Sequence, residues 1–170
     1  MVTAPSGGFR VNPTALATQA GPPMKITQLS VFVENKPGRL ALPCRLLAQA
    51  GINIVTLSLA DTQQFGILRL IVRDWSRAKE VLERAGLAVN VTEVLAVEVA
   101  DRPGGLAELL DVLEPAGVNV EYMYAFATRL GDKAVLVFRF DRPEEAIRAL
   151  AERGMNVLDQ VELFARMEKP

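Results

Sequence analysis

The chain has 170 residues, of which 50% are hydrophobic and 23% are charged, and this composition excludes a disordered or collagen-like protein. Its 19 Lys and Arg residues and 20 Asp and Glu residues give a net charge of −1, so the charge balance indicates no nucleic-acid partner. The sequence has no histidine and one cysteine, Cys44, which excludes Ser-His-Asp and Cys-His catalysis, an intrachain disulfide and a Cys-rich zinc site. We expect no metal, no cofactor and, since no segment has ~20 consecutive apolar residues, no membrane contact.

Residues 1–23 differ from the rest of the sequence. They are rich in Gly and Pro, carry Arg10 as their only charge and show no hydrophobic periodicity. They also lack the apolar core of a secretory signal. We therefore expect 1–23 to be a disordered leader, whether or not it belongs to the natural protein, and the fold to begin at Met24. A cytoplasmic location then fits the single free thiol.

An internal repeat organises the remainder of the chain. The segment 35–41 (Asn-Lys-Pro-Gly-Arg-Leu-Ala) returns as 101–107 (Asp-Arg-Pro-Gly-Gly-Leu-Ala), at an offset of 66. Between 35–56 and 101–122, 8 of 22 positions are identical without a gap. The repeat predicts a tandem duplication with one domain over 24–93 and a second over 94–170.

Hydrophobic periodicity predicts a β-α-β-β-α-β order in the first copy. Leu29, Val31 and Val33 alternate with other side chains, which is typical of a strand with one buried face. The further elements expected are a helix that ends at Gly51, strands at 52–59 and 67–72 joined by a hairpin at 63–66, a helix from Asp74 or Ser76 to Gly86, and a strand from Val89.

The second copy repeats this order, with a helix from Leu106, a strand over 134–140 and a helix around Ala146 and Leu150. An interior proline breaks or bends a helix. Pro43 therefore predicts a late start or a bend in the first helix of copy one, and Pro115 predicts that its counterpart ends near Leu113.

Two such units form an α+β protein of the ferredoxin-like class, with antiparallel sheets covered by helices on one face. The segment 89–99 is nearly continuous strand without a linker, so the two units should be rigidly coupled. Paired side by side, they would form an eight-stranded sheet whose other face is still partly apolar. We expect a homodimer to bury that face.

The turn after the first strand of each copy is the strongest candidate for a binding site. Gly38, and Gly104-Gly105 in the second copy, have no Cβ to keep a ligand off the N–H groups at the helix start. Asn35 and Asp101 stand where a side chain accepts a hydrogen bond from an ammonium group. This combination suits a free amino acid, although a Pro-Gly turn also simply joins a strand to a helix.

Other polar and aromatic residues carry weaker signals. Asn53 and Asn119, at matching positions, either occupy plain turns or face a ligand across an interface. Tyr122 and Tyr124 are expected in the core or on the sheet surface, not in a ligand cage.

The segments 29–40 and 50–54 resemble the opening of an ACT domain, and 101–106 and 116–120 repeat the resemblance. It covers both copies, about residues 25–166. It implies a free-standing regulatory protein without catalytic residues, which binds a free amino acid between paired ACT units and signals to a partner enzyme of amino-acid metabolism.

By the same resemblance, each site combines the turn of one unit with the asparagine of another. The residues implied are Asn35, Pro37, Gly38, Arg39 and Leu40 with Asn119, and Asp101, Pro103, Gly104, Gly105 and Leu106 with Asn53. Some family members have a histidine where this chain has Val33 and Val99, so one ligand contact is missing and the identity of the amino acid stays open.

Three alternatives remain. The regulatory small subunit of acetohydroxyacid synthase has a similar opening, but its second half is not usually another ACT copy. An acylphosphatase-like enzyme on the same architecture would hydrolyse acyl phosphates. A ligand-free assembly module would pair through its sheet edges and would bind no amino acid.

Overall fold

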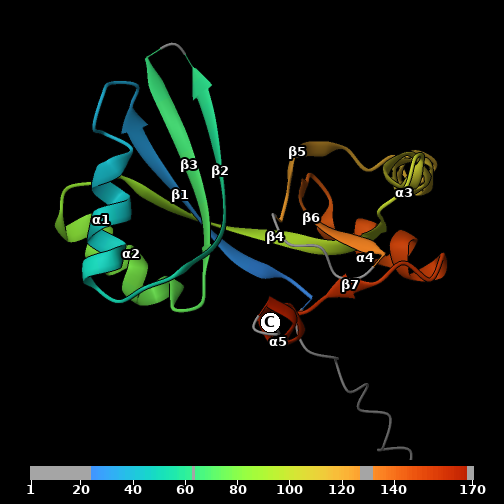
Figure 1. The fold of residues 1–170 in the computed structure, drawn as a ribbon. Helices are drawn as coiled ribbons and strands as arrows, with labels where there is room; N and C mark the ends of the chain where they lie inside the picture. The colour runs from blue at the N-terminus through green and yellow to red at the C-terminus, as the bar shows by residue number, and fades with distance from the viewer. Residues whose placement is uncertain (1–23, 63, 127–131, 168–170) are drawn as a thin grey trace, which may run out of the picture.

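The computed structural model describes residues 24–62, 64–126 and 132–167, so the expected leader at 1–23 lies outside the described part. The first unit contains β1 (Ile26–Glu34), α1 (Ala41–Gln49), β2 (Ile54–Thr62), β3 (Phe65–Val72), α2 (Trp75–Arg84) and the start of β4 (Val89–Ala100) (Figure 1). The second contains the rest of β4, α3 (Gly105–Leu113), β5 (Val120–Ala125), β6 (Lys133–Phe140), α4 (Pro143–Glu152), β7 (Val157–Leu158) and α5 (Gln160–Met167).

The long strand β4 belongs to both units. Its first half pairs antiparallel with β1, ending with Val94 opposite Ile26. Its second half pairs antiparallel with β6, from Leu95 opposite Phe138, and also with β7. The continuous strand predicted over 89–99 is therefore confirmed, and the proposed domain boundary after residue 93 falls inside it.

Strand order confirms the predicted fold class. The order is β2-β3-β1-β4-β6-β5, with β7 also beside β4, which gives each unit the arrangement of a ferredoxin-like βαββαβ fold. Seven strands are described instead of the expected eight, because β4 serves as the last strand of one unit and the first of the next. No helix in the described ranges is long and apolar enough to cross a membrane.

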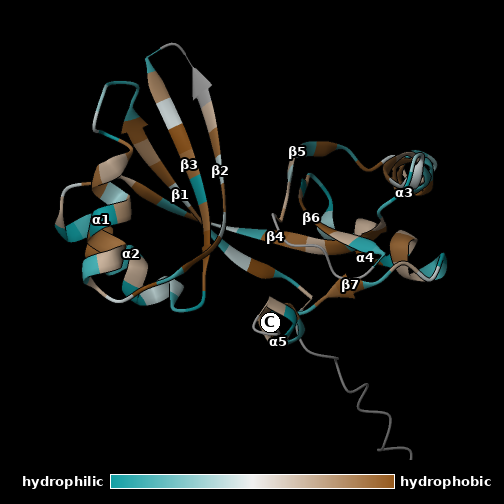
Figure 2. Cartoon of the chain, viewed as in Figure 1, coloured by the Kyte–Doolittle hydropathy of each residue, from teal (hydrophilic) through white to brown (hydrophobic). Residues whose placement is uncertain are grey.

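All four helices of the repeat lie on the outside of the two sheets, α1 and α2 over the first and α3 and α4 over the second (Figure 1). Figure 2 colours much of the strands as hydrophobic, and buried hydrophobic side chains form a core between helices and strands in each unit. In the first unit this core includes Leu29, Leu68, Leu70, Ala78 and Leu82. In the second it includes Leu95, Val97, Phe138, Ala146 and Leu150.

A third core lies between the inner faces of the two sheets. Ile26 and Ile71 of the first unit pack there with Val135 and Val137 of the second and with Phe164 of α5. The inner apolar face, which we expected a homodimer to bury, is thus covered to a large extent within one chain. The sequence analysis did not predict α5, which closes this core at one end.

Helix boundaries follow from the prolines as expected. α1 begins at Ala41, so Pro43 lies in its first turn, where a missing N–H costs no helical hydrogen bond. α3 ends at Leu113, two residues before Pro115. Asp74 caps α2 by accepting a hydrogen bond from the backbone N–H of Arg77 at 3.1 Å, which resolves the choice between Asp74 and Ser76.

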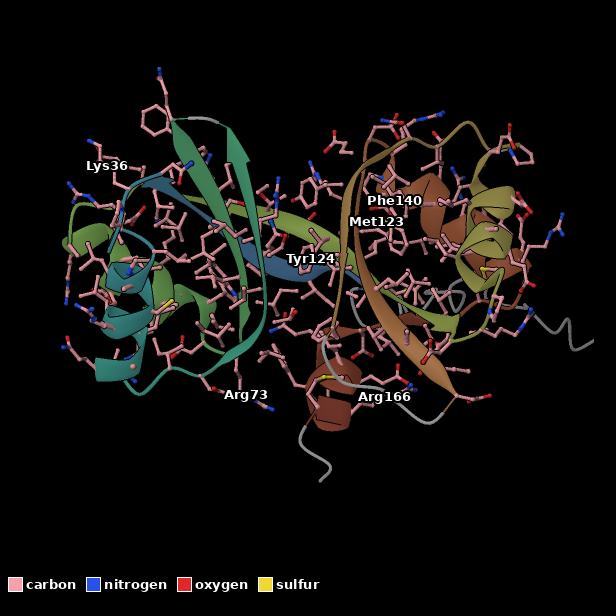
Figure 3. All side chains as sticks on the ribbon, turned by 45° about the horizontal axis from the view of Figure 1, so that its top comes forward. Lys36, Arg73, Met123, Tyr124, Phe140 and Arg166 are labelled. Atoms are coloured by element: carbon pink, nitrogen blue, oxygen red, sulfur yellow. The ribbon has the colours of Figure 1, made fainter. Side chains whose placement is uncertain are left out.

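A buried polar cluster links the inner faces of the two sheets. The side chain of Gln28 is inaccessible to solvent, and it donates to the hydroxyl of Tyr122 and accepts from that of Tyr124, both at 2.9 Å. The guanidinium of Arg69 stacks over the ring of Tyr122 at 3.9 Å. These contacts place both tyrosines, each partly buried, at the inner face of the second sheet (Figure 3 labels Tyr124), which agrees with the expected position in the core or on the sheet surface.

Alkaline pH is expected to weaken the fold through this cluster. Burial, with a smaller contribution from Tyr122, raises the pKa of Tyr124 above its usual value of 10.0. The unfolded chain loses this proton near pH 10 while the native chain keeps it, so the free energy of unfolding should fall above pH 10, by up to about 1.4 kcal/mol per pH unit. Lys25 contributes to this loss in the same direction. Hydrogen bonds to Glu144 and Glu93 raise the pKa of its ammonium group above 10.5, so its titration also lowers the free energy of unfolding at alkaline pH.

Urea unfolding below and above pH 10 measures this loss. Tyr124→Phe removes one titrating group, so its unfolding free energy should depend less steeply on pH above 10, although its stability at neutral pH is lower. Equal slopes for the variant and the parent chain would contradict the assignment.

Candidate functional site

The first predicted turn, residues 35–40, joins β1 to α1. The backbone N–H of Asn35 donates to the carbonyl of Gln64 at 3.0 Å. Gly38 has φ of +82°, a left-handed conformation that favours glycine. The Nε of Arg39 lies 2.9 Å from a carboxylate oxygen of Glu34. A cleft of about 250 Å³ adjoins the turn, with Arg39 and Leu42 on one side and residues 86–88 on the other.

The second predicted turn, residues 101–106, has the same place between β4 and α3. The N–H of Asp101 donates to the carbonyl of Asp132 at 2.9 Å, and Gly104 has φ of +87°. Arg102 donates to both carboxylate oxygens of Glu108, at 2.7 and 2.8 Å. A cleft of about 200 Å³ lies here between Gly105 and residues 154–156, in the position that matches the first cleft.

The two turns differ in one glycine. A Cβ on Gly105 would lie 2.0 Å from the carbonyl oxygen of Ala100, so this glycine is required by the fold. Its predicted role in opening the turn to a ligand stays a prediction. Arg39 has the matching place in the first turn, and α1 begins only at Ala41.

The other predicted site residues lie at the surface of these turns. Pro37 and Pro103 are exposed turn residues. Leu40 and Leu106, at matching positions at the helix starts, are 40% and 37% exposed.

The two asparagines lie elsewhere. The N–H of Asn119 donates to a carboxylate oxygen of Asp141 at 2.8 Å, at the start of β5. Asn53 precedes β2 and lines a cleft of about 390 Å³ with residues of α2 and α5, none of them from 101–106. The cleft beside the first turn is lined by first-unit residues. Neither cleft brings a turn together with an asparagine of the other unit within one chain. The pairing of each turn with such an asparagine therefore stays a prediction.

Sequence reasoning missed a buried carboxylate that holds α5. The side chain of Glu98 is 5% exposed and forms ion pairs with Arg166 of α5 and, at 3.2 Å, with Lys133. The amide of Asn156 donates to it at 3.0 Å. Asp159, which accepts a hydrogen bond from the N–H of Glu162 at 2.8 Å at the start of α5, was the sequence signal for this helix.

This architecture defines the class of protein, a tandem of two ferredoxin-like units with a cleft beside the first helix of each. The sequence profile of the family described as ACT domain pair matches residues 24–167. The chain belongs to this family, which confirms the resemblance predicted from the two turn motifs.

Solved structures are similar to the chain over most of its length. Protein BT0572 from Bacteroides thetaiotaomicron is 38% identical, with 83% of this chain and 96% of that chain covered and a TM-score of 0.77. The regulatory subunit of aspartate kinase from Thermus thermophilus, in a ligand-free form, is 18% identical, with 74% and 91% covered and a TM-score of 0.54. The latter likeness concerns the fold alone. No curated protein matches the chain.

Proposed function

We propose that this protein is a non-catalytic, cytoplasmic regulator that binds a free amino acid at its ACT-type turns and passes the signal to an enzyme of amino-acid metabolism. The observation that carries the proposal is the pair of clefts, about 250 and 200 Å³, at matching positions beside the two turns. Membership of the ACT domain pair family supports it, as does the similar fold of a protein described as a regulatory subunit of aspartate kinase.

The chemistry proposed for each turn is the recognition of a zwitterion. N–H groups at the start of α1 or α3 would bind the carboxylate, and Asn35 or Asp101 would accept hydrogen bonds from the ammonium group. A charged acceptor makes a hydrogen bond roughly twice as strong as a neutral one. The turn with Asp101 should therefore bind the amino acid more tightly than the turn with Asn35.

We further propose a homodimer, because an asparagine that completes either turn would come from a second chain. The outer face of edge strand β2 carries Leu57 and Leu59, which are 50% and 48% exposed, and Leu42 of α1 is 36% exposed. A second copy that covers this apolar strip would place Asn53, just before β2, at an interface between chains.

Amino-acid binding is tested by thermal-shift measurements with the twenty amino acids, followed by calorimetry on turn variants. Asp101→Ala should weaken binding at its turn by about 1–3 kcal/mol, and Asn35→Ala should have a smaller effect. Asp111→Ala, an exposed change along α3, is the matched control and should bind like the parent chain.

Two results would contradict the proposal. One is the absence of any thermal shift with all twenty amino acids, which would favour an assembly module. The other is equal affinity and stoichiometry in the parent chain and both turn variants. Light scattering that gives the 18.5 kDa of a single chain would contradict the homodimer alone.

A further inference from the structure

A cleft of about 260 Å³ lies between the inner faces of the two sheets. Strands of both units form its walls, β1, β3 and β4 of the first and β5 and β6 of the second (Figure 1 labels these strands). Ile26, at the start of β1, packs in the inner core with α5. Ser30 and Phe32, further along the same strand, line the cleft. The cleft is therefore at the end of the space between the sheets that α5 does not close.

A row of polar side chains crosses the first sheet at this cleft. The register of the strands places Ser30 of β1 between Asn90 of β4 and Arg69 of β3, and residues paired in this way share one face of a sheet. Ser30 is 8% exposed, and its hydroxyl oxygen accepts a hydrogen bond from the amide of the buried Gln28 at 3.1 Å. The row thus continues the buried polar cluster toward the solvent.

The second sheet has apolar residues at the matching positions. There the register pairs Ala96 of β4 with Leu158 of β7 and with Val137 of β6. All three residues are inaccessible to solvent and belong to the inner core. The same place in the duplicated sheet is therefore apolar and closed in the second unit, and polar and open to a cleft in the first.

Arg69 brings a positive charge to the cleft that no carboxylate in the described part of the chain pairs with. Its guanidinium lies 3.9 Å from the centre of the Tyr122 ring, and its Nε is buried without a hydrogen-bond partner. The two other charged residues at the cleft neutralise each other, because the Nε of Arg139 lies 3.1 Å from a carboxylate oxygen of Glu121. A half-buried cation without a counterion favours the binding of an anion.

Phe32 and Ile67 give the cleft an apolar side. They pair across β1 and β3, two positions along from the pair of Ser30 with Arg69, and therefore lie on the same face of the sheet. Phe32 is 40% exposed, and Ile67 is half-buried. The cleft therefore places a hydrocarbon surface beside an uncompensated guanidinium.

We propose that this cleft binds a small carboxylate with an apolar body between the two units. Arg69 binds the carboxylate, the hydroxyl of Ser30 and the amide of Asn90 donate further hydrogen bonds, and Phe32 and Ile67 contact the hydrocarbon. Of the described residues that line this cleft, Phe32 also lines the one beside the first turn, but none is a turn residue or asparagine proposed to bind an amino acid. Binding here does not depend on the function proposed for the turns.

Benzoate is a suitable probe, and NMR of the ring signals of the two tyrosines is the readout, because Tyr122 lines the cleft. Benzoate should shift the Tyr122 signals in a saturable way, and the uncharged benzamide should bind much more weakly. Arg69→Gln should weaken benzoate binding about tenfold. Arg148→Gln, the same change at an exposed position of α4, is the matched control and should bind like the parent chain.

A carboxylate built into the chain gives a second test. Ser30→Asp places one directly opposite Arg69, where it compensates the guanidinium. Benzoate should therefore bind this variant about tenfold more weakly than the neutral Ser30→Asn. Equal affinity of the two Ser30 variants would overturn the proposal. Equal affinity of Arg69→Gln and the parent chain, or no saturable response to benzoate in the millimolar range, would do the same.

Two further arms test the place and the class of the ligand. Asn35→Ala should keep full affinity for benzoate, and loss of binding in that variant would place the probe at the first turn and contradict the proposed site. Inorganic phosphate, which has no hydrocarbon to contact Phe32 and Ile67, should bind more weakly than benzoate. Tighter binding of phosphate would contradict a ligand with an apolar body.

Discussion

Arg166→Met is expected to lower the free energy of unfolding by about 2–4 kcal/mol, because it leaves a buried carboxylate without its partner in α5. Glu98 has a side chain that is 5% exposed. After the change it keeps Lys133 at 3.2 Å and the amide of Asn156 at 3.0 Å. Lys133 is itself about half exposed, so it compensates the buried charge only in part.

Urea unfolding of Arg166→Met measures this loss against two controls. Arg84→Met breaks an ion pair with Glu80 whose side chains are 77% and 57% exposed, and it should change stability little. The double variant Glu98→Leu with Arg166→Met removes the buried charge as well, and it should recover much of the lost stability. If Arg166→Met were no less stable than Arg84→Met, the ion pair would not hold α5 in place.

Local pattern explains why the two units and their helix boundaries could be predicted. The odd-numbered residues of β1, among them Leu29 and Val31, face the helices, and alternation between neighbouring residues requires no distant information. The same holds for Pro43 and Pro115, because a proline constrains the residues next to it.

The inner core could not be predicted in this way. Gln28 lies on the other face of β1, and a glutamine is usually exposed, yet this one is inaccessible to solvent. Its partners, Tyr122 and Tyr124, are 94 and 96 positions away in the chain. Contacts at such separation depend on how the two sheets fold toward each other around β4, and no local signal encodes that curvature.

The candidate site likewise has features that could be predicted from the sequence and features that could not. The repeated turns could be recognised, and clefts lie beside both of them. The cleft of about 390 Å³ beside Asn53 was not predicted, because α5 forms one of its walls and lies about 90 residues after Arg73 and Arg77 in the chain. The requirement of the fold for glycine at position 105 was not predicted, because only the structure places the carbonyl of Ala100 near it.

Gly105→Ala is therefore expected to cost about 3 kcal/mol or more of the free energy of unfolding. The added methyl carbon would lie 2.0 Å from the carbonyl oxygen of Ala100. Neither residue can move away easily. Ala100 is the last residue of β4 that pairs with β6, opposite Lys133, and the N–H of Gly105 donates to the carbonyl of Arg102 at 3.0 Å.

Gly104→Ala provides the comparison, one residue away in the same turn. No atom lies within 4 Å of its added methyl carbon, so only the left-handed backbone, with φ of +87°, opposes the change, at about 1 kcal/mol. Denaturant unfolding of the two variants separates a backbone collision from a conformational preference. Equal losses would show that Ala100 moves away at little cost and that the fold does not require glycine at position 105.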